Sequence, residues 1–244
     1  MRNIKLTLQY DGTAYHGWQM QTNAPTVQET LSGAIERITG VRPQLVGSSR
    51  TDAGVHAKRF VCNFKTDASI PSERIPTALN TYLPKDIVCL IAEDEKPDFD
   101  ARFSAKKKRY TYYILNSKQP DAFFCDYSWH FPYELDISKM KKAAEAFLGT
   151  HDFVGFAASG FTVKTTVREI YSLDIDKEGD IIKITITGDG FLYNMVRIMA
   201  GTLAFVGCGK IAAEDMADII ASKDRNRAGI TAPPQGLFLT EVYY

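Results

Sequence analysis

The most apolar run of the sequence, FLYNMVRIMAGTLAFVGCG from Phe191 to Gly209, is the feature that most restricts the fold. A run of about this length either spans a membrane or forms a helix inside a globular core. Asn194 and Arg197 interrupt it, so we predict a buried helix and no membrane span. The apolar side of this helix would carry Leu192, Met195, Met199, Leu203 and Val206.

The first part of the chain alternates between strand and helix patterns. Period-2 hydrophobicity from Ile4 to Tyr10 predicts a half-buried strand, which also argues against a signal peptide at the N-terminus. Thr26 to Glu29 is a capping box, and it starts a helical stripe that Gly40 ends. Further strands are expected near 45–46, 59–64 and 87–92, with a second helix over 72–79. This order of elements is ferredoxin-like.

The second part has a similar mixture. We place a domain boundary near Ser104, which divides the chain into an N-terminal ferredoxin-like domain, 1–104, and a C-terminal α+β domain, 105–244. Helical stripes are expected from Met140 to Leu148 and over 215–221, a hairpin over 171–186, and a last strand over 237–242. The length of 244 residues suits two domains of this size.

The composition excludes some classes of function. Lys and Arg total 29 and equal Asp and Glu, so the protein is not basic overall, although a local basic patch remains possible. The four cysteines are far apart and form no CxxC pair, which argues against a zinc site or a redox pair. We expect buried, reduced thiols in a cytoplasmic protein.

The loop GSSRTDAGVHA, Gly47 to Ala57, is the first candidate site. Asp52 lies beside Arg50, and a carboxylate next to a guanidinium stays ionised and can act as a nucleophile. Gly54 would give the backbone the freedom that such a turn needs. On this stretch alone, an Asx-turn with a surface ion pair explains the residues equally well. We interpret His56 as a residue satisfied by loop backbone and not as a metal ligand.

Two further groups of residues bear on chemistry. Lys106 to Arg109 lead into a tyrosine-rich strand in which Tyr110 and Tyr112 share a face. Cations and rings in this arrangement suit phosphates and unstacked bases of RNA, although a solvated charge run before a core strand is the alternative. Arg197 lies off the apolar stripe of its helix, where it either reaches solvent or pairs with a buried carboxylate.

Four blocks together resemble the tRNA pseudouridine synthases of the TruA type. They are YDGTAYHGWQ (10–19), SRTDAGVHA (49–57), ARFSAKKKRYTYYI (101–114), and GFLYNMVRIMAGTL (190–203) with GLFL (236–239). The blocks span most of the chain, and SRTDAGVHA is the most specific of them. Asp100 stands where the family often has His, and Ser49 where it often has Gly, which leaves the branch of the family open.

The resemblance implies conversion of uridine to pseudouridine at positions 38, 39 and 40 of the tRNA anticodon stem-loop. It implies that Asp52 is the nucleophile, that Arg197 pairs with it, that Tyr110 stacks on the target uracil, and that Arg50 helps to extrude the nucleotide. It also implies a homodimer without cofactor or metal. Each chain would be an α+β protein of two ferredoxin-like halves, whose mixed, mainly antiparallel sheets join around a central basic cleft. A non-catalytic RNA-binding or chaperone module and a glycosidase-like hydrolase are the rival functions.

Overall fold

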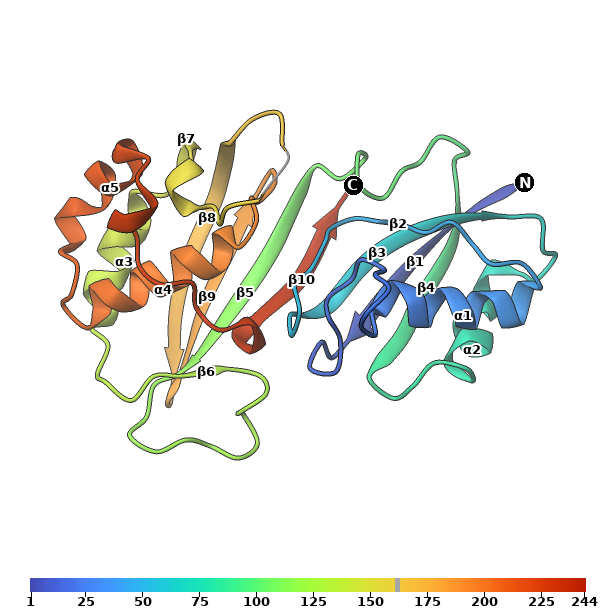
Figure 1. The fold of residues 1–244 in the computed structure, drawn as a ribbon, viewed down its shortest axis with the longest axis horizontal. Coiled ribbons are helices and arrows are strands. Elements are labelled where there is room, and N and C mark those ends of the chain that lie inside the picture. The colour runs from blue at the N-terminus through green and yellow to red at the C-terminus, as the bar shows by residue number, and fades with distance from the viewer. Residues whose placement is uncertain (161–162) are drawn as a thin grey trace. The chain divides into compact units, whose positions relative to one another are not determined.

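The computed structural model describes residues 1–160 and 163–244, and these form two compact units (Figure 1). The first unit contains Met1–Lys106 and Phe238–Tyr244, and the second contains Lys107–Leu237. The chain therefore returns to the first unit for its last seven residues. The assignment of two domains, 1–104 and 105–244, stays a proposal, as does the basic cleft expected between them.

The first unit has the ferredoxin-like order that the sequence predicts. Its elements are β1 (Arg2–Tyr10), α1 (Val27–Thr39), β2 (Val46–Gly47), β3 (His56–Thr66), a 3-10 turn η1 (Ser72–Arg74), α2 (Ile75–Asn80) and β4 (Ile87–Glu95). Strand β1 is antiparallel to β3 on one side and to β4 on the other. The far edge of β3 pairs with β2 near its end and with β10 (Leu237–Tyr243) at its start.

The bounds of α1 follow from its capping residues. Thr26 is the N-cap, and its hydroxyl accepts a hydrogen bond from the Glu29 N–H at 3.3 Å. Gly40 ends the helix with a φ of 77°, a conformation that glycine adopts without steric cost. The face between these caps buries Val27, Leu31, Ala34 and Ile35 in the core of the first unit.

The second unit is built on an antiparallel sheet with the order β5-β9-β8-β7. Its elements are β5 (Lys107–Leu115), β6 (Trp129–His130), α3 (Ile137–Glu145), β7 (Gly149–Asp152), η2 (Val154–Phe156), β8 (Val167–Glu178), β9 (Ile181–Gly188), α4 (Met195–Gly207), η3 (Ala213–Asp215), α5 (Met216–Ser222), η4 (Arg225–Arg227) and η5 (Pro234–Gly236). Helices α3 and α4 contact each other and pack on β8 and β5 respectively. The mixed α+β class predicted from the sequence is thereby confirmed.

Helix α4 is the buried helix expected from the apolar run, but it begins later than predicted. Met195, Met199, Leu203 and Val206 are fully buried. The helix does not start at Phe191, because Asn194 has a φ of 59° and a left-handed residue cannot lie inside a right-handed helix. Among the helices of residues 1–160 and 163–244, none has the length and hydropathy needed to cross a bilayer.

The cysteines correct one expectation. Cys62 and Cys89 are buried, and burial raises the pKa of both thiols, that of Cys89 to about 12. Cys125 is exposed instead, because it lies in the long connection between β5 and β6, and Cys208, directly after α4, is half-buried.

Candidate active site

The Asp52 loop connects β2 to β3 and contains a tight turn. The Val55 N–H donates to the Asp52 carbonyl at 3.1 Å, and Gly54 in the third position of the turn has a φ of 75°. This is the position where a type II turn needs a glycine. The predicted need for backbone freedom at Gly54 is therefore confirmed. The turn leaves Asp52 half-buried and Arg50 exposed.

The segment Tyr10–Gln19, which contains the last residue of β1 and the loop that follows it, fixes the Asp52 loop on both sides of Asp52. On one side, the Trp18 N–H donates to the Thr51 carbonyl at 3.1 Å, and the Tyr10 hydroxyl lies 2.8 Å from that of Thr51. On the other side, the Gly54 N–H donates to the Tyr15 carbonyl at 3.2 Å. Because hydrogen bonds hold both neighbouring segments, the backbone of Asp52 has little freedom to move.

Two glycines allow the two loops to approach this closely. A Cβ atom on Gly12 would overlap the Val55 carbonyl oxygen, and one on Gly17 would overlap that of Thr51. Gly17 also has a φ of 83°, which other residues adopt at a cost. The N-terminal block of the sequence thus acts as a support for the Asp52 loop.

We expect Gly17→Ala to lower the free energy of unfolding by about 3 kcal/mol, because the added methyl group collides with backbone and the left-handed φ is strained. Any catalysis by Asp52 should slow as well, since the collision displaces Thr51 next to Asp52. Chemical denaturation measures the change in the free energy of unfolding.

Gly33→Ala is the matched control. Gly33 lies in α1 with open space around its Cβ, and the change should stabilise the protein by about 0.5–1 kcal/mol. Equal unfolding energies for the two variants would contradict this account of the support.

His56 is satisfied by backbone, as the sequence predicts, although the donor belongs to the Tyr10–Gln19 segment. Its Nδ1 accepts a hydrogen bond from the Gly12 N–H at 3.0 Å, and its ring stacks on Phe238 at 4.5 Å between centroids. The Asp11 carboxylate lies 3.1 Å from the same nitrogen. The same nitrogen therefore lies within hydrogen-bonding distance of one backbone donor and one carboxylate.

Tyr110 and Tyr112 lie on the same face of β5 and both are buried, with 6% and 0% of their surface exposed, but they have different neighbours. Tyr110 is paired with Ile186 across the sheet, and its ring meets that of Phe191 edge-on, with 5.1 Å between centroids. Tyr112 is fully buried, and its hydroxyl donates to the Pro233 carbonyl at 2.7 Å. Burial raises the pKa of Tyr112, and the nearby charge of Arg197 opposes that shift. Tyr112 is therefore a core residue with a satisfied hydroxyl.

The basic run before Tyr110 presents an exposed face. Lys106, Lys107 and Arg109 are exposed, while Lys108 is half-buried. Arg109 is held from one side, because its Nε donates to the Thr187 hydroxyl of β9 at 3.1 Å. The cations that the sequence assigned to phosphate contacts thus lie at the start of β5.

Arg197 is anchored inside the second unit and does not simply extend into solvent. Its Nε donates to the Ala232 carbonyl and its Nη1 to the Asn194 side-chain oxygen, each at 2.7 Å. The side chain is half-buried.

The predicted site residues occupy two places. Arg50 and Asp52 belong to one loop of the first unit, whereas Tyr110 and Arg197 belong to β5 and α4 of the second. The pairing of Asp52 with Arg197 stays a prediction. Sequence reasoning missed Phe191 and Asn194 as supports, and the sole signal for Asn194 was its spacing of three residues from Arg197.

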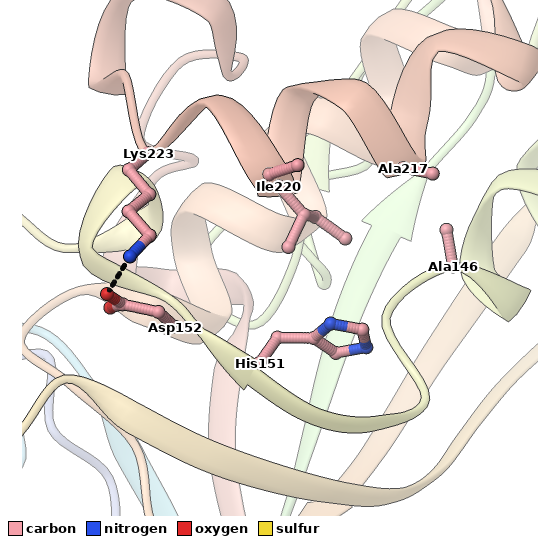
Figure 2. A pocket seen from close by; sticks show the side chains of 7 residues that line it. Ala146, His151, Asp152, Ala217, Ile220 and Lys223 are labelled. Carbon is pink, nitrogen blue, oxygen red and sulfur yellow. Dashed lines mark ion pairs between the residues drawn. The ribbon is translucent and has the colours of Figure 1, made fainter.

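The structure also has a hollow of about 300 Å³ between β7, α5 and the end of α3 (Figure 2). Its wall is mostly apolar, with an ion pair of 2.8 Å between Asp152 and Lys223. The Lys223 ammonium lowers the pKa of the Asp152 carboxyl. This hollow contains none of the predicted site residues. Within the described residues, no group of three or more His, Cys, Asp or Glu side chains is placed to hold a metal ion.

Comparisons with known proteins agree on one family. The family model described as tRNA pseudouridine synthase matches residues 7–104 and 143–244. A tRNA pseudouridine synthase A of Thermoanaerobacter sp. strain X514 is 54% identical over 244 residues, covering 100% of both chains. Proteins with that name from Acetivibrio thermocellus and Caldicellulosiruptor saccharolyticus are 52% and 51% identical, again covering 100% of both chains.

Proposed function

The chain belongs to the tRNA pseudouridine synthase family, and from this premise we propose that it isomerises uridine to pseudouridine in the tRNA anticodon stem-loop, at positions 38, 39 and 40. As a member of the family it is an isomerase that acts on tRNA. The observation that supports the proposed chemistry is the position of Asp52, the proposed nucleophile. It lies in a turn whose two neighbouring segments are held by hydrogen bonds.

The reaction needs one well-placed carboxylate. The N1–C1′ bond of uridine breaks, the uracil turns, C5 bonds to C1′, the proton on C5 leaves, and N1 gains a proton. Asp52 would attack C1′ of the ribose or C6 of the uracil, or promote elimination to a glycal, and each route uses a carboxylate at the same place. Hydrolytic glycosidases, in contrast, usually need two carboxylates.

The other proposed roles follow from the need to reach a base inside a stem. The target nucleotide has to leave the stack before its glycosidic bond can be attacked. In our proposal Arg50 promotes this extrusion, Tyr110 stacks on the extruded uracil, and Lys106 to Arg109 hold phosphates. Arg197 pairs with Asp52, which keeps the carboxylate ionised and sets its direction. The protein would work as a cytoplasmic homodimer without cofactor or metal.

Release of tritium from tRNA labelled at C5 of uridine tests this function. We expect the purified protein to release the label and to produce no free uracil. Release of free uracil would identify a glycosidase-like hydrolase. Binding of tRNA without release of label would identify an RNA-binding or chaperone module.

A further inference from the structure

We propose that Asn194 is a positioning residue for Arg197: its side-chain oxygen and the Ala232 carbonyl together fix the direction of the guanidinium. The proposal rests on the proposed role of Arg197 and names the residues on which that role depends.

Asn194 is the N-cap of α4 but does not cap it with its side chain. An asparagine at this position ordinarily accepts a hydrogen bond from the second or third N–H of the helix. The Asn194 side chain makes no such bond. Its oxygen accepts from Nη1 of Arg197 at 2.7 Å instead, and Arg197 is the third residue of the helix. The Asn194 side chain thus bonds to the arginine and does not cap the helix.

The Ala232 carbonyl holds a second nitrogen of the same guanidinium. It accepts from Nε of Arg197 at 2.7 Å, while the Ala232 N–H donates to the Arg197 carbonyl at 3.1 Å. A guanidinium is planar and its donors are rigidly arranged. Acceptors at both Nε and Nη1 therefore fix the plane of the group as well as its position.

The segment that carries Ala232 is itself fixed against α4. The Gly229 N–H donates to the Thr202 hydroxyl at 2.8 Å, and Arg225 donates to the Gly229 carbonyl at 2.8 Å. A Cβ atom on Gly201 would overlap the Ile230 carbonyl oxygen, so glycine is needed for this close approach. One of the two acceptors is therefore rigid backbone, and Asn194 supplies the one that a single substitution can remove.

Asn194 combines two properties that mutation can separate. Its φ of 59° lies in the left-handed region, which asparagine tolerates better than most residues and glycine tolerates best. Asn194→Gly consequently keeps the backbone conformation and removes the hydrogen-bond acceptor alone. Lys223→Gly is the matched control, because Lys223 has a φ of 58° at the end of α5 and borders the separate hollow of Figure 2.

We expect Asn194→Gly to reduce kcat for pseudouridine formation by about 10- to 100-fold, the size of loss that a small misplacement of a reacting group produces. The KM for tRNA and the melting temperature should stay close to those of the wild type. Lys223→Gly should keep kcat within about twofold of the wild type, since it changes a left-handed residue outside the site. An unchanged kcat in Asn194→Gly, or equal losses of kcat in both variants, would overturn the proposal.

A double-mutant cycle shows whether Asn194 acts through Arg197. Lysine has no planar donor group to align. When Asn194→Gly is added to the Arg197→Lys variant, we therefore expect it to lower the single-turnover rate by less than about twofold. A full additional loss would mean that Asn194 acts independently of Arg197 and would overturn the proposal. A wild-type protein that forms no pseudouridine would overturn the proposed function and this inference together. If the wild-type protein forms pseudouridine and the Asn194→Gly variant does so at the same rate, this inference alone is overturned.

Discussion

Asp52→Asn is expected to slow uridine isomerisation in tRNA by at least about 10⁴-fold, because removal of a catalytic nucleophile leaves substrate binding and little else. Asparagine has nearly the same shape as aspartate, and the turn is held by backbone bonds of Asp52, Gly54 and Thr51. Affinity for tRNA should therefore stay within about twofold of the wild type. Tritium release from C5 and fluorescence anisotropy with labelled tRNA measure the two quantities.

Asp67→Asn is a suitable control for this experiment. Asp67 is an exposed carboxylate of the same unit that contacts the N-terminal ammonium at 3.0 Å. Its loss should leave the rate unchanged, because exposed ion pairs contribute little. A near-normal rate in Asp52→Asn would exclude Asp52 as the nucleophile.

Tyr110→Ala is expected to lower the rate by about 10- to 100-fold, the worth of one base–aromatic stack. Tyr110→Phe keeps the ring and should retain most of the activity. The comparison at Tyr112 is also with phenylalanine, because both rings are buried and alanine at either position would cost about 3–5 kcal/mol of stability. Tyr112→Phe loses one hydrogen bond to Pro233, worth about 1 kcal/mol.

The measurement is the rate per folded enzyme, with the folded fraction taken from circular dichroism. Tyr112→Phe should approach the wild-type rate on this scale. Equal losses in Tyr110→Ala and Tyr112→Phe would contradict the assignment of the stacking ring to Tyr110.

Local patterns predicted most elements of the fold. Thr26 and Gly40 bound α1 correctly, because an N-cap hydroxyl and a left-handed glycine act within one helical turn. Strands β6 and β7 were not predicted, because neither Trp129–His130 nor Gly149–Asp152 contains a run of aliphatic residues or an alternation of apolar and polar residues. The start of α4 was predicted too early because hydrophobicity does not reveal the left-handed φ of Asn194.

The sequence indicated which residues to select as candidates for the site, but it did not indicate which other residues hold them in place. Asp52 and Arg50 could be selected because a carboxylate, a guanidinium and a glycine are adjacent in sequence. The contact of Gly12 and Gly17 with the Asp52 loop depends on segments about 40 residues apart, which periodicity cannot reveal. The bond from Arg197 to the Ala232 carbonyl is likewise invisible in sequence, since any residue supplies a carbonyl.

Mapping pseudouridine in a tRNA transcript incubated with the purified protein tests the central claim most directly. Nuclease fragments would be examined by mass spectrometry after derivatisation of pseudouridine, with the wild-type protein and Asp52→Asn in parallel. We predict pseudouridine at positions 38, 39 and 40 wherever the transcript has uridine there, and none with Asp52→Asn. Absence of pseudouridine from the anticodon stem-loop after treatment with the wild-type protein would contradict the account, as would equal modification by Asp52→Asn.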